Sequence, residues 1–256
     1  MKAYCITLKG CGDRQQHITQ VMSQTSLELE FFYGVDARTT QHPLLDNYNK
    51  RKYSYRMGRE AAIGELGCYA SHYLIWQKCI EENEPILVLE DDLNIDVEAF
   101  ERSVEITKEH INECGYIRLE NTGRKILSYA THNYDNQDLV KFLKVPQCTT
   151  AYAISPKAAK AFLESSDEFL YPVDVFLRNV WVHKQPMFGI WQAGLWGGNK
   201  PSLIGDRKRK GKKDYTVATM RLLNKAKSML LNLSQNIRHL FTLRSTHAPT
   251  RFVRGE

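Results

Sequence analysis

The chain has 256 residues, of which 43% are apolar and 25% are charged, and this composition predicts a soluble globular protein. Since no apolar run approaches the roughly 18 residues of a membrane-spanning helix, the sequence excludes a helical membrane protein. The formal charge of +6 is uneven, because residues 206–256 hold 13 basic and 3 acidic residues whereas the remainder is mildly acidic. The first ten residues make a poor signal peptide and the six cysteines lack zinc-like spacing, so we expect a cytoplasmic protein with reduced thiols.

The first sixty residues contain two apolar segments separated by polar ones. Residues 3–8 and 29–35 each predict a short strand, and a polar, helix-compatible segment starts at Asp13 between them. Residues 38–60 lack clear periodicity, which predicts a loop over a binding site.

The strongest helix of the body is predicted over residues 61–82, where apolar residues recur along one stripe. The continuous apolar run Ile86–Leu89 predicts a strand that is buried on both faces. A more polar helix is expected over about 96–112.

The second half of the body continues this alternation. Strands are predicted at 116–119, 149–154 and 188–193, and a helix is expected at 174–181. Ser155 followed by Pro156 is a good N-cap with proline in the first helical position, so another helix should begin there. Alternating strands and helices indicate an α/β sandwich with a largely parallel sheet, and we assign it to residues 1–205.

Residues 206–256 differ in character from the body. A polar basic run at 205–214 is followed by apolar residues at helical spacing, with lysine and arginine filling much of the other face. This pattern predicts a basic amphipathic helix or helix pair that lies on an anionic membrane surface. A solvated tail, an oligomer contact and nucleic-acid binding are the alternatives.

Three consecutive carboxylates, Glu90, Asp91 and Asp92, follow the strand at 86–89. In open α/β sheets, ligands bind outside the carboxyl ends of the strands. Three like charges repel each other unless a positive charge compensates them, and carboxylate oxygens suit Mg²⁺ and Mn²⁺. The trio therefore predicts a metal site, with a solvated acidic turn that caps the next helix as the alternative.

The surrounding sequence supports the first interpretation. IGELGCYASHYLIWQKCI followed by PILVLEDD resembles the hallmark region of glycosyltransferase family 25, the bacterial lipooligosaccharide galactosyltransferase family. Further segments resemble the family in the same order: YCITLKGCGDRQQHI, FFYGVDA, TTAYAISPKAAKAFLE, YPVDVFL and SLIGDR. The resemblance covers about residues 1–207. Two departures are the segment KGCG at 9–12 and a Glu-Asp-Asp trio in place of Asp-x-Asp.

This resemblance implies a GT-A-like, Rossmann-like fold and an inverting transfer of galactose from UDP-galactose to a lipooligosaccharide or LPS acceptor sugar, with formation of a beta linkage. It implies Mn²⁺ or Mg²⁺ held by Asp92 and Asp91, because a divalent cation stabilises the departing diphosphate. Glu90 and Asp91 would contact the metal or the ribose hydroxyls. The acceptor would be reached at the inner face of the inner membrane, where we expect the protein to be peripheral.

Inversion requires a general base that deprotonates the acceptor hydroxyl. Asp174, in the segment YPVDVFL, is our first candidate, because its apolar neighbours could raise its pKa. A helix N-cap is the alternative role for Asp174, and Glu120 is the alternative base.

The resemblance also implies five donor-binding residues outside the trio: Leu8, Arg14, Asp36, Ser71 and His72. Arg14 could equally be a surface charge, Asp36 a turn carboxylate and His72 a structural histidine. Gly67, like Gly64, lies within the predicted helix at a cost of about 1 kcal/mol relative to alanine. Such glycines indicate that a backbone or a ligand approaches that turn closely.

Two other functions remain open. The donor could be another UDP-sugar, such as UDP-glucose or UDP-N-acetylglucosamine. The chain could instead be a non-catalytic basic scaffold or nucleic-acid-binding protein, although an intact trio and Asp174 argue against it.

Overall fold

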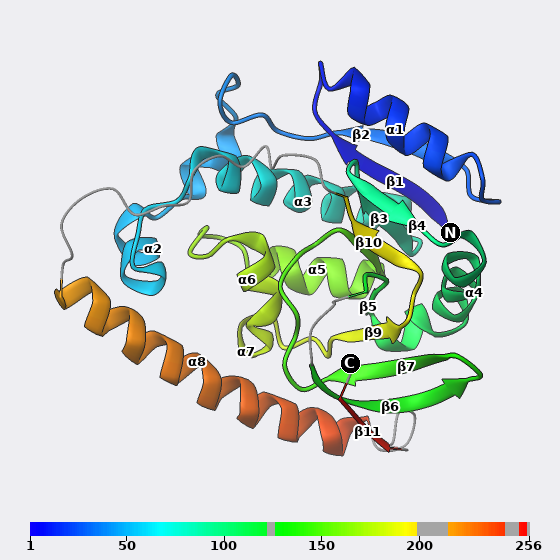
Figure 1. The fold of residues 1–256 in the computed structure, drawn as a ribbon. Coiled ribbons are helices and arrows are strands. Elements are labelled where there is room, and N and C mark those ends of the chain that lie inside the picture. Colours follow the sequence, from blue (N-terminus) through cyan, green and yellow to red (C-terminus); the bar gives the residue numbers. More distant parts are fainter. Residues whose placement is uncertain (122–125, 199–214, 244–250, 255–256) are drawn as a thin grey trace.

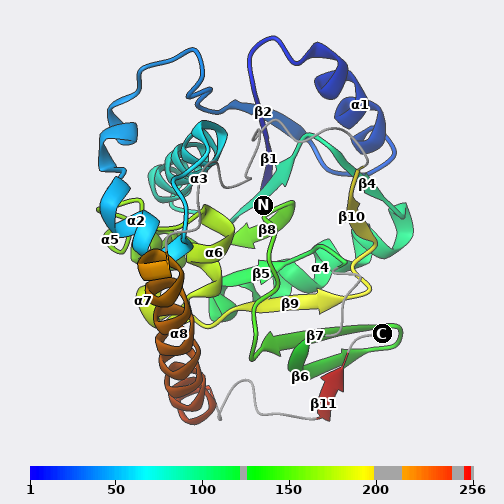
Figure 2. The ribbon, with the colours of Figure 1, turned by 60° about the vertical axis from the view of Figure 1, so that its left-hand side comes forward.

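The computed structural model describes residues 1–121, 126–198, 215–243 and 251–254. A nine-stranded sheet crosses the molecule, and helices cover both of its faces (Figures 1 and 2). The strand order is β11-β6-β7-β9-β5-β8-β3-β1-β2. In chain order the strands are β1 (Lys2–Thr7), β2 (Leu29–Tyr33), β3 (Ile86–Glu90), β5 (Tyr116–Arg118), β6 (Leu127–Tyr134), β7 (Gln137–Phe142), β8 (Ala151–Ile154), β9 (Phe188–Trp191) and β11 (Arg251–Arg254).

The direction of the strands confirms the α/β prediction in part. β2, β1 and β3 are mutually parallel, and β5 and β9 are parallel to each other. β8 lies between β3 and β5 and is antiparallel to both, while β7 and β11 reverse direction at the other end. Six of the nine strands therefore share one direction, but the sheet is mixed rather than purely parallel.

Two hydrophobic cores lie on the two faces of this sheet. One packs α3 (Ile63–Glu82) and α5 (Pro156–Glu164) with the short helices α6 (Val173–Arg178) and α7 (Val180–His183). The other packs α1 (Gly12–Met22) and α4 (Val97–Cys114) against the opposite face. The predicted helices in these regions are confirmed, except that the single helix expected at 174–181 is split into α6 and α7.

The prediction of a loop at 38–60 is wrong for most of that segment. A 3₁₀ helix, η1 (Pro43–Asn47), is followed by α2 (Lys50–Met57). Local capping explains α2: the side chain of Asn49 accepts a 3.0 Å hydrogen bond from the Lys52 amide, and Gly58 ends the helix with a φ of 74°. Because α2 is short and polar, its sequence carries no apolar stripe.

Three strand pairings were not predicted. β6 and β7 form an antiparallel hairpin, and β4 (Leu93–Ile95) pairs with β10 (Leu195–Gly197) in a small second sheet. β11 pairs with β6, so the prediction of a purely helical tail over residues 206–256 is wrong at Arg251–Arg254.

The C-terminal segment contains one long helix rather than a pair, α8 (Tyr215–Thr242). It lies along the outside of the molecule, against α2 and α7 (Figure 1). The basic run at 206–214 lies outside the described residues. Within the described ranges, we find no helix that combines the length and the apolarity needed to cross a bilayer.

Candidate active site

A pocket of about 150 Å³ opens at the carboxyl edge of β1 and β3. The parallel register pairs Ile6 with Glu90, so the residues that follow both strands emerge side by side. The pocket brings together all eight residues predicted for the donor and the metal: Leu8, Arg14, Asp36, Ser71, His72, Glu90, Asp91 and Asp92. Neither candidate base, Asp174 nor Glu120, lines this pocket.

Asp91 is the most tightly held carboxylate of the trio. One of its oxygens accepts a 2.7 Å hydrogen bond from Thr7 Oγ1, and the other accepts a 2.7 Å ion-paired hydrogen bond from Arg14 Nη1. Arg14 reaches it from the first turn of α1, and both side chains are buried. Asp91 therefore fixes the guanidinium of Arg14 at the edge of the pocket.

Asp92 has weaker compensation. Its Oδ2 lies 3.6 Å from Arg14 Nη1, and its backbone oxygen accepts a 2.5 Å hydrogen bond from the Gly198 amide. Burial, followed by the negative charge of Glu90, raises the pKa of Asp92 to about 6. Asp92 is thus the member of the trio that a bound cation would stabilise most.

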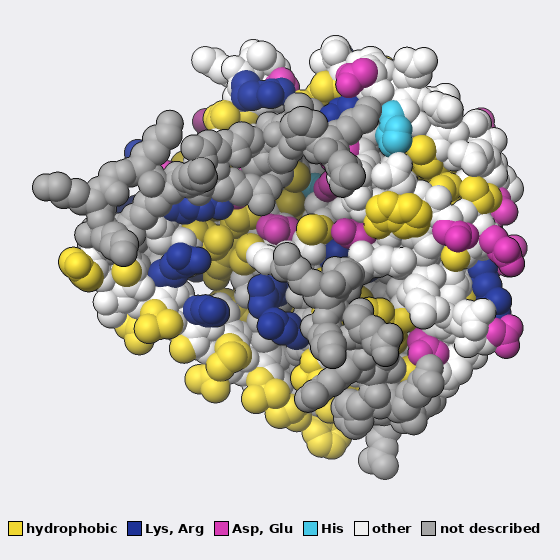
Figure 3. All heavy atoms as spheres, viewed as in Figure 1, with side chains coloured by type: hydrophobic (Ala, Val, Ile, Leu, Met, Phe, Trp, Pro, Cys, Tyr) yellow, Lys and Arg dark blue, Asp and Glu magenta, His cyan; other side chains and the backbone are white. Residues whose placement is uncertain are grey.

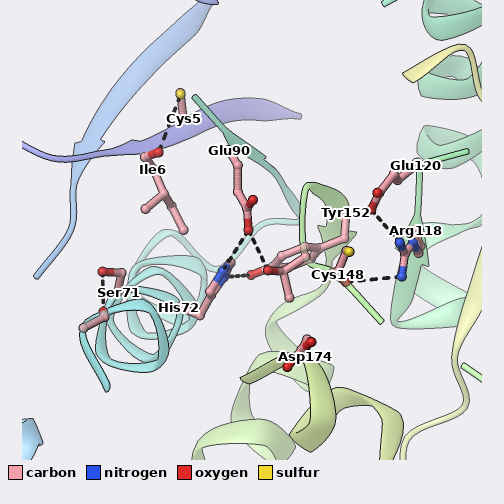
Figure 4. Close-up of polar contacts among 12 residues, drawn as sticks. Cys5, Ile6, Ser71, His72, Glu90, Arg118, Glu120, Cys148, Tyr152 and Asp174 are labelled. Atoms are coloured by element: carbon pink, nitrogen blue, oxygen red, sulfur yellow. Dashed lines mark hydrogen bonds and ion pairs between the residues drawn. The ribbon is translucent and has the colours of Figure 1, made fainter. Parts of the chain in front are cut away.

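Glu90 turns toward α3 and β8 instead (Figure 4). Its Oε1 accepts a 2.6 Å hydrogen bond from Thr149 and lies 3.9 Å from His72 Nε2. Burial alone would raise the pKa of Glu90, but the contacts with His72 and Thr149 outweigh it and lower the pKa. Glu90 is therefore held as a carboxylate facing His72.

A buried hydrogen-bond chain orients His72. Trp76 Nε1 donates to the hydroxyl of Tyr152 over 3.0 Å, and that hydroxyl lies 2.8 Å from His72 Nδ1. Because the tyrosine oxygen already accepts from Trp76, its own proton is best placed on His72 Nδ1. This arrangement leaves Nε2 of His72 as the N–H that faces Glu90.

The pocket wall formed by β2 and α3 depends on a close approach of the Val35 backbone to α3. Ser71 Oγ accepts a 2.9 Å hydrogen bond from the Val35 amide and donates a 2.7 Å bond to the Gly67 carbonyl. A Cβ atom at Gly67 would lie 2.5 Å from the Val35 oxygen. The prediction that a backbone approaches this glycine closely is confirmed, and Ser71 holds the wall in place.

Asp36 lies at the end of the same wall with a partner of its own. Arg38 donates two 2.7 Å hydrogen bonds to its two carboxylate oxygens, and this interaction lowers the pKa of Asp36. A ligand hydroxyl at Asp36 would share these oxygens with Arg38.

The two candidate bases belong to a second cluster beside Cys148 (Figure 4). Arg118 donates a 2.5 Å hydrogen bond to Glu120 and further bonds to the carbonyls of Pro146, Gln147 and Cys148. Burial raises the pKa of the Cys148 thiol, and the charges of Glu120, Glu90 and Asp174 raise it further against the effect of Arg118. The charges of three carboxylates therefore act on one thiol.

Within this cluster the two candidates are held differently. Burial raises the pKa of Glu120, which is ion-paired with Arg118. Asp174 stands half-buried in the first turn of α6, where its carboxylate accepts a 2.8 Å hydrogen bond from the Val175 amide. Asp174 is thus held by a helix terminus, and Glu120 by a cation.

Sequence reasoning missed the residues that position these groups: Thr7, Arg38, Arg118, Thr149 and Tyr152. Arg118 alone carried a recognisable signal, because a charged residue in the short apolar segment YIRL is costly to bury without a partner. The others are ordinary strand or loop residues whose roles depend on partners up to 84 positions away.

We tested whether the trio fits a divalent cation. The described residues contain no ready group of three or more His, Cys, Asp or Glu side chains that could hold one. Both Asp91 oxygens already accept hydrogen bonds. The Asp92 carboxylate is less committed, because Arg14 Nη1 lies 3.6 Å from its Oδ2. A single hard carboxylate ligand fits an ion that takes its other oxygens from phosphates and water.

Comparisons with known proteins agree with the motif. A Glycosyltransferase 25 family member of Aedes aegypti is 30% identical over 189 residues, covering 68% of this chain and 30% of the relative. Procollagen galactosyltransferase 2 of Mus musculus is 27% identical over 194 residues (72% and 31%), and the lipooligosaccharide biosynthesis protein lic2B of Haemophilus influenzae is 31% identical over 91 residues (35% and 33%). The chain spans about a third of the length of these relatives. The model of glycosyltransferase family 25, described as an LPS biosynthesis protein family, matches residues 1–177, and the chain therefore belongs to glycosyltransferase family 25.

Proposed function

We propose that this chain is an inverting, metal-dependent glycosyltransferase of GT-A-like fold that moves galactose from UDP-galactose to a sugar of a lipooligosaccharide acceptor. Family membership supports glycosyl transfer, and the names of the mouse and Haemophilus relatives support the galactosyl donor and the lipooligosaccharide acceptor. The acceptor class would place the protein at the inner face of the inner membrane.

The observation that carries the proposal is the shared pocket edge of Arg14 and Asp92. Asp92 would hold Mn²⁺ or Mg²⁺, and the ion when bound would offset the negative charge that builds on the departing diphosphate. Arg14 adds a fixed positive charge at the same edge, because Asp91 and Thr7 hold it there.

The remaining donor contacts follow from the walls of the pocket. Asp36 stands at the end of β2 and would accept hydrogen bonds from ribose hydroxyls beside Arg38. His72 presents a fixed Nε2 hydrogen that Glu90 shares, so this pair would orient the hydroxyls of the transferred sugar.

Asp174 would act as the general base. The acceptor oxygen attacks the anomeric carbon opposite the diphosphate, the sugar–phosphate bond breaks with its electron pair, and the acceptor proton passes to the carboxylate. Asp174 and Glu120 are both half-buried, and we prefer Asp174 because Glu120 is ion-paired with Arg118.

Release of UDP tests this function. We expect turnover with UDP-galactose that requires Mn²⁺ or Mg²⁺ and stops with chelator, at a rate well above that with UDP-glucose or UDP-N-acetylglucosamine. An NMR analysis of the product should show an inverted anomeric centre. Asp174→Asn should abolish transfer and Glu120→Gln should slow it less. Turnover that chelator leaves intact, or a retained anomeric configuration, would contradict the mechanism.

A further inference from the structure

The exposed face of α8 is apolar. Eight large apolar side chains of this helix are exposed beside Tyr215, a larger group than on any other described element. They are Met220, Leu222, Leu223, Met229, Leu230, Leu233, Ile237 and Phe241. Leu223, Leu230, Ile237 and Phe241 recur at spacings of seven and four, so they form one stripe along the helix.

The buried face of α8 is polar. Asn236 Nδ2 donates a 2.9 Å hydrogen bond to the Leu143 carbonyl, and Asn224 Nδ2 donates a 3.0 Å bond to the Tyr55 carbonyl. Asn232 accepts a 3.2 Å bond from the Trp181 amide. The helix is thus held on the body by side-chain amides, in the reverse of the usual arrangement, in which a surface helix buries its apolar stripe.

The charges on α8 are all positive. Residues 215–242 contain four lysines and arginines and no aspartate or glutamate. All four are exposed, and none forms a salt bridge with another described residue. Lys227 lies one turn from both Leu223 and Leu230, and Arg238 lies one turn from Phe241. Figure 3 shows the apolar side chains along the edge formed by α8, with lysine and arginine beside them.

A cleft of about 670 Å³ between α2 and α8 adds room for an anionic group at the margin of this face. Arg59, Arg221 and Lys225 line it together with Met57 and Leu222. Arg59 is ion-paired with Glu65, which leaves Arg221 and Lys225 as the cations available to a phosphate.

We propose that the exposed face of α8 docks onto an anionic phospholipid bilayer, with the helix parallel to the surface. The apolar stripe enters the boundary between headgroups and acyl chains, and the flanking cations contact lipid phosphates. A second copy of the chain fits this face less well, because two such faces would bring eight positive charges together without a single helical carboxylate to neutralise them.

Vesicle flotation tests the proposal on the full chain. The wild type should float with vesicles that contain phosphatidylglycerol, and should float far less with phosphatidylcholine alone or at high salt. The triple variant Leu223→Gln/Leu230→Gln/Phe241→Gln should weaken flotation at least about tenfold, since three apolar side chains leave the bilayer. Lys227→Gln/Arg238→Gln should weaken it several-fold and reduce the dependence on salt.

Matched controls come from exposed side chains outside α8. Leu127→Gln removes an exposed leucine from β6, and Lys144→Gln/Lys157→Gln removes two exposed lysines that lie off α8; both should float as the wild type does. A wild type that never floats, or a triple variant that floats normally, would overturn the proposal. So would a wild-type dimer in sedimentation that the triple variant converts to a monomer without any vesicle binding. Flotation requires no donor, and UDP release in solution should be unchanged in these variants, so this test is independent of the proposed reaction.

Discussion

Two buried ionisable side chains, Asp91 and Lys141, lie in different halves of the sheet and differ in whether an opposite charge pairs with them. At the pocket, Asp91 is matched by the guanidinium of Arg14 and by the hydroxyl of Thr7. At the contact between β7 and α8, Lys141 is fully buried, and its partners among the described residues are neutral: the carbonyl of Phe142 and the side chain of Asn236. Burial lowers the pKa of Lys141 to about 7.

The difference shows which charge the fold can use. A buried carboxylate that forms a charge-assisted hydrogen bond with a guanidinium can hold that cation in place at the edge of a binding pocket. Burial lowers the pKa of Lys141, which has no counter-charge among the described residues, so we expect the stability of the folded chain to depend on pH at this site.

The largest effect on turnover is expected at Asp92, the carboxylate beside the Arg14–Asp91 ion pair. Asp92→Asn keeps the shape of the side chain but removes the charge proposed to hold the metal, and we expect turnover to fall about 10²–10³-fold. UDP release under saturating UDP-galactose and Mn²⁺ measures the loss. Asp135→Asn, at an exposed turn carboxylate, should change turnover less than twofold. Full activity of Asp92→Asn would remove this residue from the mechanism.

Breaking the Arg14–Asp91 ion pair should lower stability in addition to any effect on donor binding. Arg14→Met leaves Asp91 buried without its cation, and we expect the free energy of unfolding to fall by about 3–5 kcal/mol. Denaturant titration provides the measurement. Arg38→Met serves as the control, since it breaks a pair with Asp36 that is partly exposed and should cost no more than about 1 kcal/mol. Equal losses in the two variants would show that burial does not distinguish the pairs.

Removing the buried lysine Lys141 should raise the free energy of unfolding rather than lower it, and by a smaller amount. The unfolded lysine has a pKa near 10.5 and the folded one about 7, so the unfolded state binds more protons between these values and the stability contributed by this site rises with pH. Lys141→Met removes that dependence. The variant should be more stable than the wild type at pH 7 by about 1–2 kcal/mol after the loss of the bond to Asn236.

The pH dependence of that difference is the decisive readout. The stability advantage of Lys141→Met over the wild type should fall by about 1 kcal/mol per pH unit from pH 7 to 9, and so vanish or reverse by pH 9. Burial, followed by the charge of Lys141, lowers the pKa of His239 to about 4, so this neighbour stays neutral over the range. A constant gap would mean that Lys141 is charged in the folded protein.

The part of the sheet that holds the Arg14–Asp91 ion pair is also the part that could be predicted from the sequence. The apolar run of β3 leads directly into the trio, and Arg14 follows β1 by seven residues, so a parallel pairing of β1 with β3 places both at one edge of the sheet, although Arg14 and Asp91 are 77 positions apart. Local chemistry likewise predicts α5, which begins at Pro156 with the Ser155 side chain accepting from the Ala158 amide. The cap of α5 depends only on neighbours along the chain.

The part of the sheet around Lys141 could not be predicted, because its polar residues are buried by partners that are distant in the chain. The β6–β7 hairpin contains Gln137, Asp138 and Lys141, all buried, so its sequence lacks the apolar alternation of a typical strand pair. Lys141 is covered by Asn236, 95 positions later in the chain. The hydrogen bond from Tyr152 that orients His72 is hidden in the same way, because it joins residues 80 positions apart.

A last test separates charge from shape at the pocket. Gly67→Ala places a methyl group 2.5 Å from the Val35 oxygen, so the wall between β2 and α3 must shift, and we expect a loss of about 1–3 kcal/mol with a raised KM for the donor. Gly12→Ala, in the first turn of α1, meets no atom within 4 Å and should be neutral or stabilising by up to about 1 kcal/mol. Thermal unfolding and donor titrations of the two variants make the comparison. Because neither change alters a charge, a rise in KM confined to Gly67→Ala would show that the wall, and not only the carboxylates, shapes the donor pocket, whereas equal effects would contradict the close approach.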